Sequence, residues 1–350
     1  MKKSGWVGMI CAAALLLQGC ASSAEGNAAV EATENPTAPP PQEQAELKVD
    51  ANAVAWPKEK LTLAENGVPS LRVYVVDDGK VETVDVESYV EGVLAGEMKN
   101  DWPLEALKAQ AILARTFVLK FLEEKESKYP EADISTDIEE AQAYDKSAIN
   151  ERIQQAVAQT KGQVLSAGGK LPYAWFHAHS GSVTEKAIPG LGWNKAEPVY
   201  TLVTQGNEPE NVENEKDAKE LKDAQRWEAT FSAEEFAAAC AKQGVEASVG
   251  DGATLAVAER GESGRVMLLD VDGERVKAAE LRIALGSTKM RSTLLTSLRT
   301  EGGKVLMAGT GYGHGVGMSQ WGAYGMAEQG KTAHEIATHY FKDVQVVRIW

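Results

Sequence analysis

A single glutamate, Glu97, occupies a position where a carboxylate could act as a general acid. The apolar residues before it recur at helical spacing, as Tyr89, Val90, Val93 and Leu94, and the next turn of the same stripe ends on Glu97. A carboxylate there is partly desolvated and lies at the negative end of the helix dipole, so its pKa is expected to rise. A raised pKa near neutrality suits proton donation to a leaving group. An ordinary helix-terminal glutamate that points to water would give the same spacing.

A glycine-rich segment near the C-terminus presents a histidine. Five glycines alternate with other residues in Gly309-Thr-Gly311-Tyr-Gly313-His314-Gly315-Val-Gly317. Without side chains, such a backbone can adopt positive φ angles and approach a ligand closely. We therefore expect His314 to belong to a binding site. The segment has no G-x-G-x-x-G register, which argues against a dinucleotide site.

A nearby segment matches the nucleotide-binding P-loop pattern letter by letter, over residues 325–332. A strand should precede that loop, whereas residues 319–329 have the pattern of a helix. Gly330 then serves as the glycine at the helix C-terminus, and Thr332 and Glu335 form a capping box for the next helix. The sequence therefore predicts no nucleoside triphosphate site.

The other histidines and the cysteines do not have the spacing of a metal site or a disulfide. His177 and His179 lie two residues apart on an expected strand, and a metal ion bound to either would need further ligands from elsewhere in the chain. His334 and His339 are five residues apart in the last expected helix, which is unsuited to a shared ion. Cys240 lies in a helical run and is expected to be a small buried residue. We expect no metal and no cofactor.

The N-terminal residues predict export. Lys2 and Lys3 precede an apolar run from Val7 to Leu17, which is too short to span a bilayer as a folded anchor. The run ends in Leu-Gln-Gly-Cys20, which resembles a bacterial lipobox. We predict a signal peptide over residues 1–19 and a lipid on Cys20, which would give an exported lipoprotein anchored to the membrane. An uncleaved anchor is the alternative.

Composition separates the rest of the chain into a tether and a folded domain. Residues 20–57 are rich in Ala, Glu, Pro, Ser and Gln, which favours a disordered tether. Residues 58–350 are long enough for a single large domain. The formal net charge of −15 argues against nucleic acid as a partner, because no basic stripe is present to meet phosphates. Within the domain, residues 206–225 are densely charged and are expected to form a solvated surface insertion.

Local patterns predict how the candidate residues are positioned. A hairpin joins residues 71–76 to 81–84 through an Asp-Gly turn, and Asp85 can cap the helix that ends at Glu97. The next helix begins near Pro103, and its polar face carries Gln110 and Arg115.

Further hairpins and helices are expected downstream. A helix is predicted over residues 149–160, and a second hairpin pairs 163–166 with 172–177 through Gly168-Gly169. A third hairpin includes residues 265–270, with Gly273 in its turn. Hairpins interleaved with helices, rather than regular βαβ units, indicate an α+β fold.

Two long motifs resemble the SpoIID/LytB family, which includes stage II sporulation protein D. The first runs from Glu97-Met98 through Trp102-Pro103 to Arg115-Thr116, and the second from Gly313-His314-Gly315 to Ser319-Gln320-Trp321-Gly322. Shorter family blocks lie between them in the same order: Gln142-Ala-Tyr144, Thr160-Lys-Gly162-Gln163-Val164, Phe176-His177, Ser180-Gly181, Thr184-Glu185, Ser263-Gly264-Arg265, Leu281-Arg282 and Leu285-Gly286. The resemblance covers about residues 71–341, and the two long motifs are highly specific.

The resemblance implies lytic transglycosylase activity on peptidoglycan glycan strands, with Glu97 as the catalytic residue. A protonated Glu97 would donate to the glycosidic oxygen between N-acetylmuramic acid and N-acetylglucosamine. Its anion would then accept the proton of the muramic C6 hydroxyl as a 1,6-anhydro ring closes. Candidates for sugar contacts are Gln110, Arg115, His177, Ser180, His314 and Gln320, of which His314 and Gln320 are the strongest. The tethered enzyme would face the cell wall.

The sequence departs from the family pattern in two places. Lys99 follows Glu97-Met98 where the family usually has proline, so the local turn is expected to differ. Gly181-Ser182 replaces the usual Gly-Gly, and a cysteine that some members carry nearby is absent. The metal seen in some relatives in this region is therefore not expected here.

Two other functions remain open. Other family members are described as enhancers of amidases, so the protein could be a non-catalytic, glycan-binding recruiter of a cell-wall amidase. It could also be a structural tether between lipid and wall with no partner enzyme. Loss of activity in Glu97→Gln would separate the enzyme from both alternatives, and co-purification of an amidase would separate the recruiter from the tether.

Overall fold

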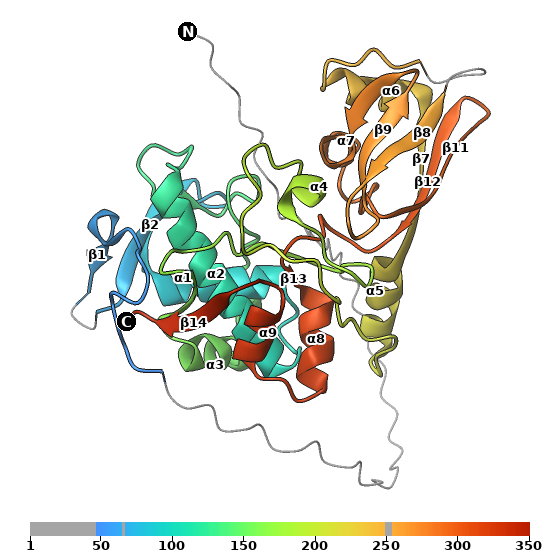
Figure 1. Cartoon of the computed structure of the whole chain (residues 1–350). Coiled ribbons are helices and arrows are strands. Elements are labelled where there is room, and N and C mark those ends of the chain that lie inside the picture. The colour runs from blue at the N-terminus through green and yellow to red at the C-terminus, as the bar shows by residue number, and fades with distance from the viewer. Residues whose placement is uncertain (1–46, 65–66, 249–253) are drawn as a thin grey trace, which may run out of the picture.

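The computed structural model describes residues 47–64, 67–248 and 254–350 (Figure 1). The predicted signal peptide at residues 1–19, the lipid on Cys20 and most of the tether therefore lie outside the described residues. In the described part of the chain, no helix combines the length and the apolar character needed to cross a membrane. The described residues form helices and several mostly antiparallel sheets, which confirms the α+β fold class.

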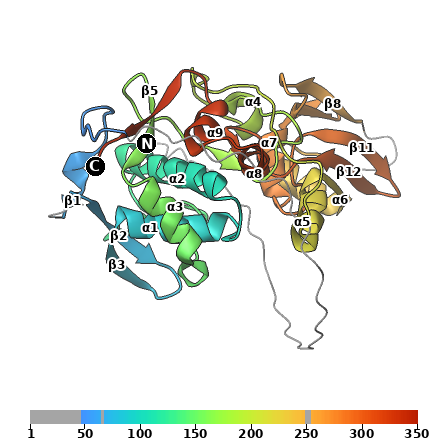
Figure 2. The same cartoon turned by 90° about the horizontal axis from the view of Figure 1, so that it is seen from below.

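Helix α2 (Leu104–Glu124) forms the centre of the main hydrophobic core. Its buried residues include many alanines, which allow neighbouring helices to approach closely. The helices that pack against it are α1 (Val86–Glu97), α3 (Glu151–Gln159), α8 (Gln320–Glu328) and α9 (Ala333–His339). Figure 2 shows α1, α2 and α3 next to one another, with α9 above α2. This packing brings the end of α1 close to the start of α8, although the two are far apart in the sequence.

A four-stranded sheet lies beside α1 and leads the chain into it. β2 (Pro69–Val75) and β3 (Lys80–Asp85) are antiparallel, which confirms the first predicted hairpin. β1 (Thr62–Leu63) and β4 (Ile134–Ser135) also pair with β2. Asp85 caps α1 as predicted, accepting a hydrogen bond of 2.9 Å from the amide of Ser88.

Strands from the C-terminal segment pair with strands from the middle of the chain. β14 (Val344–Arg348) runs antiparallel to β5 (Gln163–Ala167), and β13 (Met318–Ser319) runs parallel to β6 (Phe176–His177). The second predicted hairpin is therefore wrong, because residues 163–166 pair with the C-terminal strand and not with 172–177. Gly168 and Gly169 do reverse the chain locally, at φ 57° and 80°. A turn signal predicts a local reversal, but tertiary packing decides which strand becomes the partner.

A second hydrophobic core is built from residues between 226 and 310 (upper right in Figure 1). One sheet contains β7 (Arg226–Ser232), β12 (Lys304–Thr310) and β11 (Leu295–Glu301), and another contains β8 (Leu255–Arg260), β9 (Val266–Val271) and β10 (Glu274–Lys277). Helices α6 (Ala233–Ala241) and α7 (Ala278–Ala284) pack against these sheets. The β9–β10 hairpin, with Gly273 in its turn at φ 88°, confirms the third predicted hairpin. Cys240 is fully buried in this core, as predicted.

Two segments differ from their predicted character. Val54 and Trp56, which were expected in the disordered tether, are buried in the main core, so the folded part begins before residue 58. The charged stretch 206–225 contains helix α5 (Glu215–Gln225), which buries Leu221 and Ala224 while most of its charged residues stay exposed. The remaining short elements are α4 (Ala187–Leu191) and the 3₁₀ helices η1 (Lys58–Lys60) and η2 (Lys146–Ala148).

Candidate active site

Glu97 is the last residue of α1 and is 7% exposed. Its Oε1 accepts a hydrogen bond of 2.7 Å from the backbone amide of Ala143. Its Oε2 is buried and has no hydrogen-bond partner among the described residues. The two oxygens of this carboxyl group therefore have different surroundings.

Burial raises the pKa of the Glu97 carboxyl to about 8, because the charged form has lost its hydration. The Ala143 amide and the Gln320 side chain favour the charged form, but they only partly offset this shift. The predicted desolvation of Glu97 is thus confirmed. At neutral pH the group is mostly protonated and can donate a proton.

Gln320 reaches Glu97 from the start of α8. Its side-chain Nε2 donates a hydrogen bond of 3.2 Å to the backbone carbonyl oxygen of Glu97. Ser319 caps the same helix by accepting a hydrogen bond of 3.2 Å from the amide of Gly322. The pairing of β13 with β6 fixes where this helix begins. The structure therefore brings Glu97 and Gln320 together, although they are 223 residues apart in the sequence.

A second group of buried polar residues contains His177 and His314, whose ring centroids are 5.5 Å apart. The Nδ1 of His177 lies 3.2 Å from the carbonyl oxygen of Val316, so this nitrogen carries the hydrogen in the neutral ring. The Nδ1 of His314 instead accepts a hydrogen bond of 3.0 Å from the amide of Val316. Burial, together with nearby arginines, lowers the pKa of His314 to about 3, and burial lowers the pKa of His177 well below its usual value. Both rings are neutral at pH 7.

Two charged residues that the sequence analysis did not select hold this second group together. The fully buried guanidinium of Arg265 donates through Nη2 to the Ser180 carbonyl oxygen at 2.7 Å and through Nε to the His314 carbonyl oxygen at 3.3 Å. Glu208 accepts hydrogen bonds from the Ser180 amide at 2.6 Å and from the Ser319 hydroxyl at 2.7 Å. Arg265 lies in one of the short family blocks, so the sequence carried a signal that could have identified it. Glu208 lies in the stretch expected to be solvated, where composition gives no sign of a buried carboxylate.

The ladder of β6 and β13 separates the two groups. Phe176 and Met318 lie in the main core, whereas the next residues, His177 and Ser319, contact the second group. Gln320 then reaches Glu97. Among the described residues, the two groups are therefore joined through the consecutive residues 319 and 320 and not by a contact between Glu97 and a histidine.

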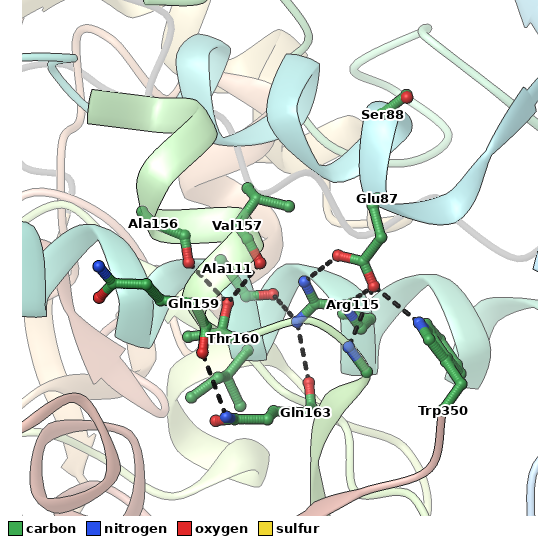
Figure 3. A network of polar contacts seen from close by, with 12 residues as sticks. Glu87, Ser88, Ala111, Arg115, Ala156, Val157, Gln159, Thr160, Gln163 and Trp350 are labelled. Carbon is green, nitrogen blue, oxygen red and sulfur yellow. Dashed lines mark hydrogen bonds and ion pairs between the residues drawn. The ribbon is translucent and has the colours of Figure 1, made fainter. Parts of the chain in front are cut away.

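Arg115 and Gln110 lie apart from both groups. The guanidinium of Arg115 is fully buried, forms an ion pair with Glu87 and donates a hydrogen bond of 2.9 Å to the Gln163 carbonyl oxygen (Figure 3). Glu87 also accepts a hydrogen bond of 2.8 Å from the indole of Trp350, so this network joins α1, α2, β5 and the C-terminus. Because this network encloses the guanidinium, Arg115 is a structural residue and not a sugar contact. Gln110 is also fully buried, and its amide has no partner among the described residues.

The other predicted features of this region are local. Within the described ranges, no group of three or more His, Cys, Asp or Glu residues is arranged to hold a metal ion. His334 in α9 lies 2.8 Å from the side-chain oxygen of Gln163, and His339 lies 2.8 Å from the side-chain nitrogen of Asn207. Thr332 and Glu335 form the predicted capping box, and residues 320–328 form the predicted helix before it. Residues 325–332, which match the P-loop pattern, therefore lie at the end of α8 and in its connection to α9.

Comparison with known proteins adds independent findings. Residues 77–166 match the sequence model of the stage II sporulation protein family, and residues 193–317 match that of a domain of unknown function. Stage II sporulation protein D of Bacillus amyloliquefaciens is 33% identical over 298 residues, which cover 81% of this chain and 80% of that protein. An uncharacterized protein of Brachyspira hyodysenteriae is 30% identical over 276 residues, which cover 76% of this chain and 68% of that protein. The amidase enhancer of Bacillus subtilis is 28% identical over 289 residues, covering 72% of this chain but 39% of that longer protein.

Proposed function

The chain belongs to the stage II sporulation protein D family, and we propose that it is a lytic transglycosylase of peptidoglycan with Glu97 as its acid and base. The observation that carries this proposal is the state of the Glu97 side chain. Burial raises its pKa to about 8, and its Oε2 has no hydrogen-bond partner among the described residues. Such a carboxyl group is protonated at neutral pH, and no protein group among the described residues already occupies its second oxygen.

In the first step, protonated Glu97 donates its proton to the oxygen of the glycosidic bond between N-acetylmuramic acid and N-acetylglucosamine. The bond from the muramic C1 to that oxygen breaks, and the N-acetylglucosamine portion leaves as an alcohol. Positive charge develops at C1 and the ring oxygen, as in other glycoside cleavages. Proton donation by a positioned acid typically accelerates such a step by about 10²- to 10⁴-fold.

In the second step, the C6 hydroxyl of the same muramic residue attacks C1. The anionic Glu97 accepts the hydroxyl proton, and a 1,6-anhydro ring closes. The carboxyl group is then protonated again and ready for another cycle. No water is consumed, because the nucleophile belongs to the substrate.

This mechanism needs a single carboxyl group near the bond that breaks. Glycosidases that use water require two, placed roughly 5 to 10 Å apart. The raised pKa of Glu97 arises from burial, opposed by two hydrogen-bond donors, and not from a neighbouring carboxylate. These surroundings favour the substrate-assisted reaction.

Gln320 is the proposed sugar contact nearest to Glu97, because its side chain already reaches the Glu97 carbonyl oxygen. We assign His177, Ser180 and His314 to contacts with sugar units further along the strand, since they share the second group with Arg265. In the neutral His177 ring, Nε2 has no hydrogen-bond partner among the described residues and can accept a hydrogen bond from a sugar hydroxyl. Substitution of each would raise KM for long strands more than for short ones.

The proposal extends to the place of action. A lipid on Cys20 and a tether after it would hold the folded part outside the membrane, facing the cell wall. Cys20 and most of the tether lie outside the described residues, and their assignment is a prediction from the lipobox and the composition. Labelling with a radioactive fatty acid in cells, compared with Cys20→Ala, tests the lipid.

A second function is favoured by one comparison, the likeness to a protein named amidase enhancer. In that case the protein would bind glycan strands and recruit or activate a cell-wall amidase without cleaving the strands itself. The buried Glu97 would then be a structural residue. An amidase that co-purifies with both the wild type and Glu97→Gln would support this function.

The deciding experiment incubates the purified protein with glycan strands, with and without stem peptides, beside Glu97→Gln. Products are analysed by mass spectrometry. Strands ending in 1,6-anhydro-muramic acid from the wild type alone would support the transglycosylase. Intact strands that nevertheless bind the protein would contradict it and favour the recruiter.

A further inference from the structure

The segment of residues 142–145 lies against the last turns of α1 at unusually short range. A Cβ atom at Gly96 would lie 2.6 Å from the amide nitrogen of Tyr144 and 2.8 Å from the carbonyl carbon of Ala143. Both distances are shorter than real Cβ contacts, so a larger residue at position 96 would force this backbone away. The amide of Asp145 also donates a hydrogen bond of 2.9 Å to the Gly92 carbonyl oxygen, which fixes the segment to the helix. The absence of a side chain at Gly96 therefore sets how closely the segment approaches.

The close approach has a direct effect on Glu97, the next residue in the chain. It places the Ala143 N–H 2.7 Å from Oε1, while Oε2 has no partner among the described residues. In a protonated carboxyl group, the carbonyl oxygen is a better hydrogen-bond acceptor than the hydroxyl oxygen. The oxygen that accepts the Ala143 N–H is therefore the carbonyl oxygen, and the proton is carried by Oε2.

We propose that Gly96 is a positioning residue, which admits residues 142–145 to the last turn of α1 and so selects Oε2 of Glu97 as the oxygen that carries the proton. In the proposed reaction, Oε2 gives this proton to the glycosidic oxygen and later accepts the proton of the muramic C6 hydroxyl. This role rests on the proposed function. The protonation state of Glu97 can nevertheless be measured without any substrate.

The charged and titratable groups near Glu97 do not provide another explanation for its protonation. Tyr89, about two turns before Glu97 on α1, is fully buried and donates a hydrogen bond of 3.2 Å to the Ser135 carbonyl oxygen. Lys99, two residues further on, forms ion pairs with Asp217 and Glu220 of α5. From α8, the nearest group is the uncharged Gln320. Among the described residues, the Ala143 N–H is the hydrogen bond that distinguishes the two carboxyl oxygens, while the Gln320 side chain also favours the charged form.

The test replaces Gly96 by alanine, whose methyl group would push residues 142–145 outward and lengthen the Ala143 hydrogen bond. The first measurement is the pKa of Glu97, which is determined by ¹³C NMR of the labelled side chain over a series of pH values. Because the lost hydrogen bond favoured the charged form, the pKa is expected to move above its wild-type value of about 8. The second is the infrared C=O stretch of protonated Glu97, assigned by difference against Glu97→Gln, which is expected to shift to higher frequency. In kinetics, kcat is expected to fall by about 10²-fold with little change in KM.

Two further variants keep the test decisive. Ala143→Pro removes the N–H without adding a side chain to α1. If Gly96→Ala does not fold, the pKa and the C=O stretch of Glu97 are measured in this variant instead. Tyr89→Phe removes a buried hydrogen bond from the same helix without touching Ala143, so it should lower stability while the pKa and C=O stretch of Glu97 stay as in the wild type.

The outcomes separate this inference from the proposed function. An unchanged pKa and an unchanged C=O stretch in folded Gly96→Ala or Ala143→Pro would overturn the positioning role, whatever the enzymatic activity. A wild-type protein that makes no anhydro product would overturn the proposed function, while the spectroscopic results still decide whether Gly96 selects the protonated oxygen. If both spectroscopic shifts occur and the kinetic loss is confined to kcat, the positioning role of Gly96 and the proposed function are both supported.

Discussion

The hydroxyl of Ser319 donates a hydrogen bond of 2.7 Å to the buried carboxylate of Glu208. Burial by itself would raise the pKa of Glu208, but His179 and the donors of Ser180 and Ser319 outweigh it and lower the pKa. Glu208 is therefore ionised at neutral pH. Because Gln320 follows Ser319 directly, this anion helps to fix the residue that reaches Glu97.

The first prediction concerns this link. In Ser319→Ala the buried Glu208 carboxylate loses one of its donors, so we expect the free energy of unfolding to fall by about 1 to 3 kcal/mol. The variant also loses the hydrogen bond by which Ser319 caps α8, and the range above includes this loss. Chemical denaturation measures the loss. Ser319→Thr keeps the hydroxyl and should retain more of the stability, and equal losses in both variants would contradict the assigned hydrogen bond.

The second prediction concerns the pH dependence of activity. Since Glu97 must be protonated to act as an acid, kcat/KM for glycan strands should decline as pH rises through about 8. The decline should follow a single ionisation and be absent from the residual activity of Glu97→Gln. Rates measured from about pH 3.5 to 10 on strands of fixed length would show it. A decline centred near the ordinary pKa of glutamate, about 4.5, would contradict a buried acid.

The third prediction concerns stability and the same carboxyl group. Its pKa is raised from 4.5 in the unfolded chain to about 8 in the folded protein. Between these pH values the folded state keeps a proton that the unfolded state has lost, so stability falls as pH rises. The slope from this group is at most about 1.4 kcal/mol per pH unit.

Glu97→Gln removes that titration. We therefore expect the variant to gain stability relative to the wild type as pH rises from 4.5 to 8, and to show no such gain below 4.5. Unfolding by urea at a series of pH values measures the difference. A constant difference across the whole range would show that the folded protein does not hold Glu97 as a buried acid.

The fourth prediction concerns the network around Arg115. Arg115→Met leaves the partly buried Glu87 carboxylate without its ion-pair partner, so we expect a loss of about 3 to 5 kcal/mol in the free energy of unfolding. The double variant Arg115→Met with Glu87→Gln should recover part of this loss. In a correctly folded Arg115 variant, KM for glycan should be unchanged, because the guanidinium is enclosed by the protein.

An exposed ion pair provides the matched control. Arg72 binds Asp133 at 2.6 Å, but its side chain is 57% exposed. Arg72→Met should therefore cost less than about 1 kcal/mol. Equal losses for the two arginine variants would contradict the structural role assigned to Arg115.

Local sequence signals predicted those elements whose partners are close in the chain. The hairpin before Asp85, the cap of α1 and the hairpin at Gly273 all depend on residues a few positions apart, and all are confirmed. The hairpin predicted for residues 163–177 failed because β5 finds its partner, β14, at the C-terminus. Propensity and turn chemistry act locally and do not identify a partner that only packing brings near.

The sequence by itself determined that Glu97 would end an apolar stripe and lose its water, because the spacing of a helix places every third or fourth residue on one face. Only the tertiary structure decided what surrounds the carboxyl group. Ala143 and Gln320 reach it from 46 and 223 residues away, and Glu208 enters the second group from a charged stretch. Such contacts depend on how helices and strands pack around α2, since a buried polar group must find its partners within the folded core.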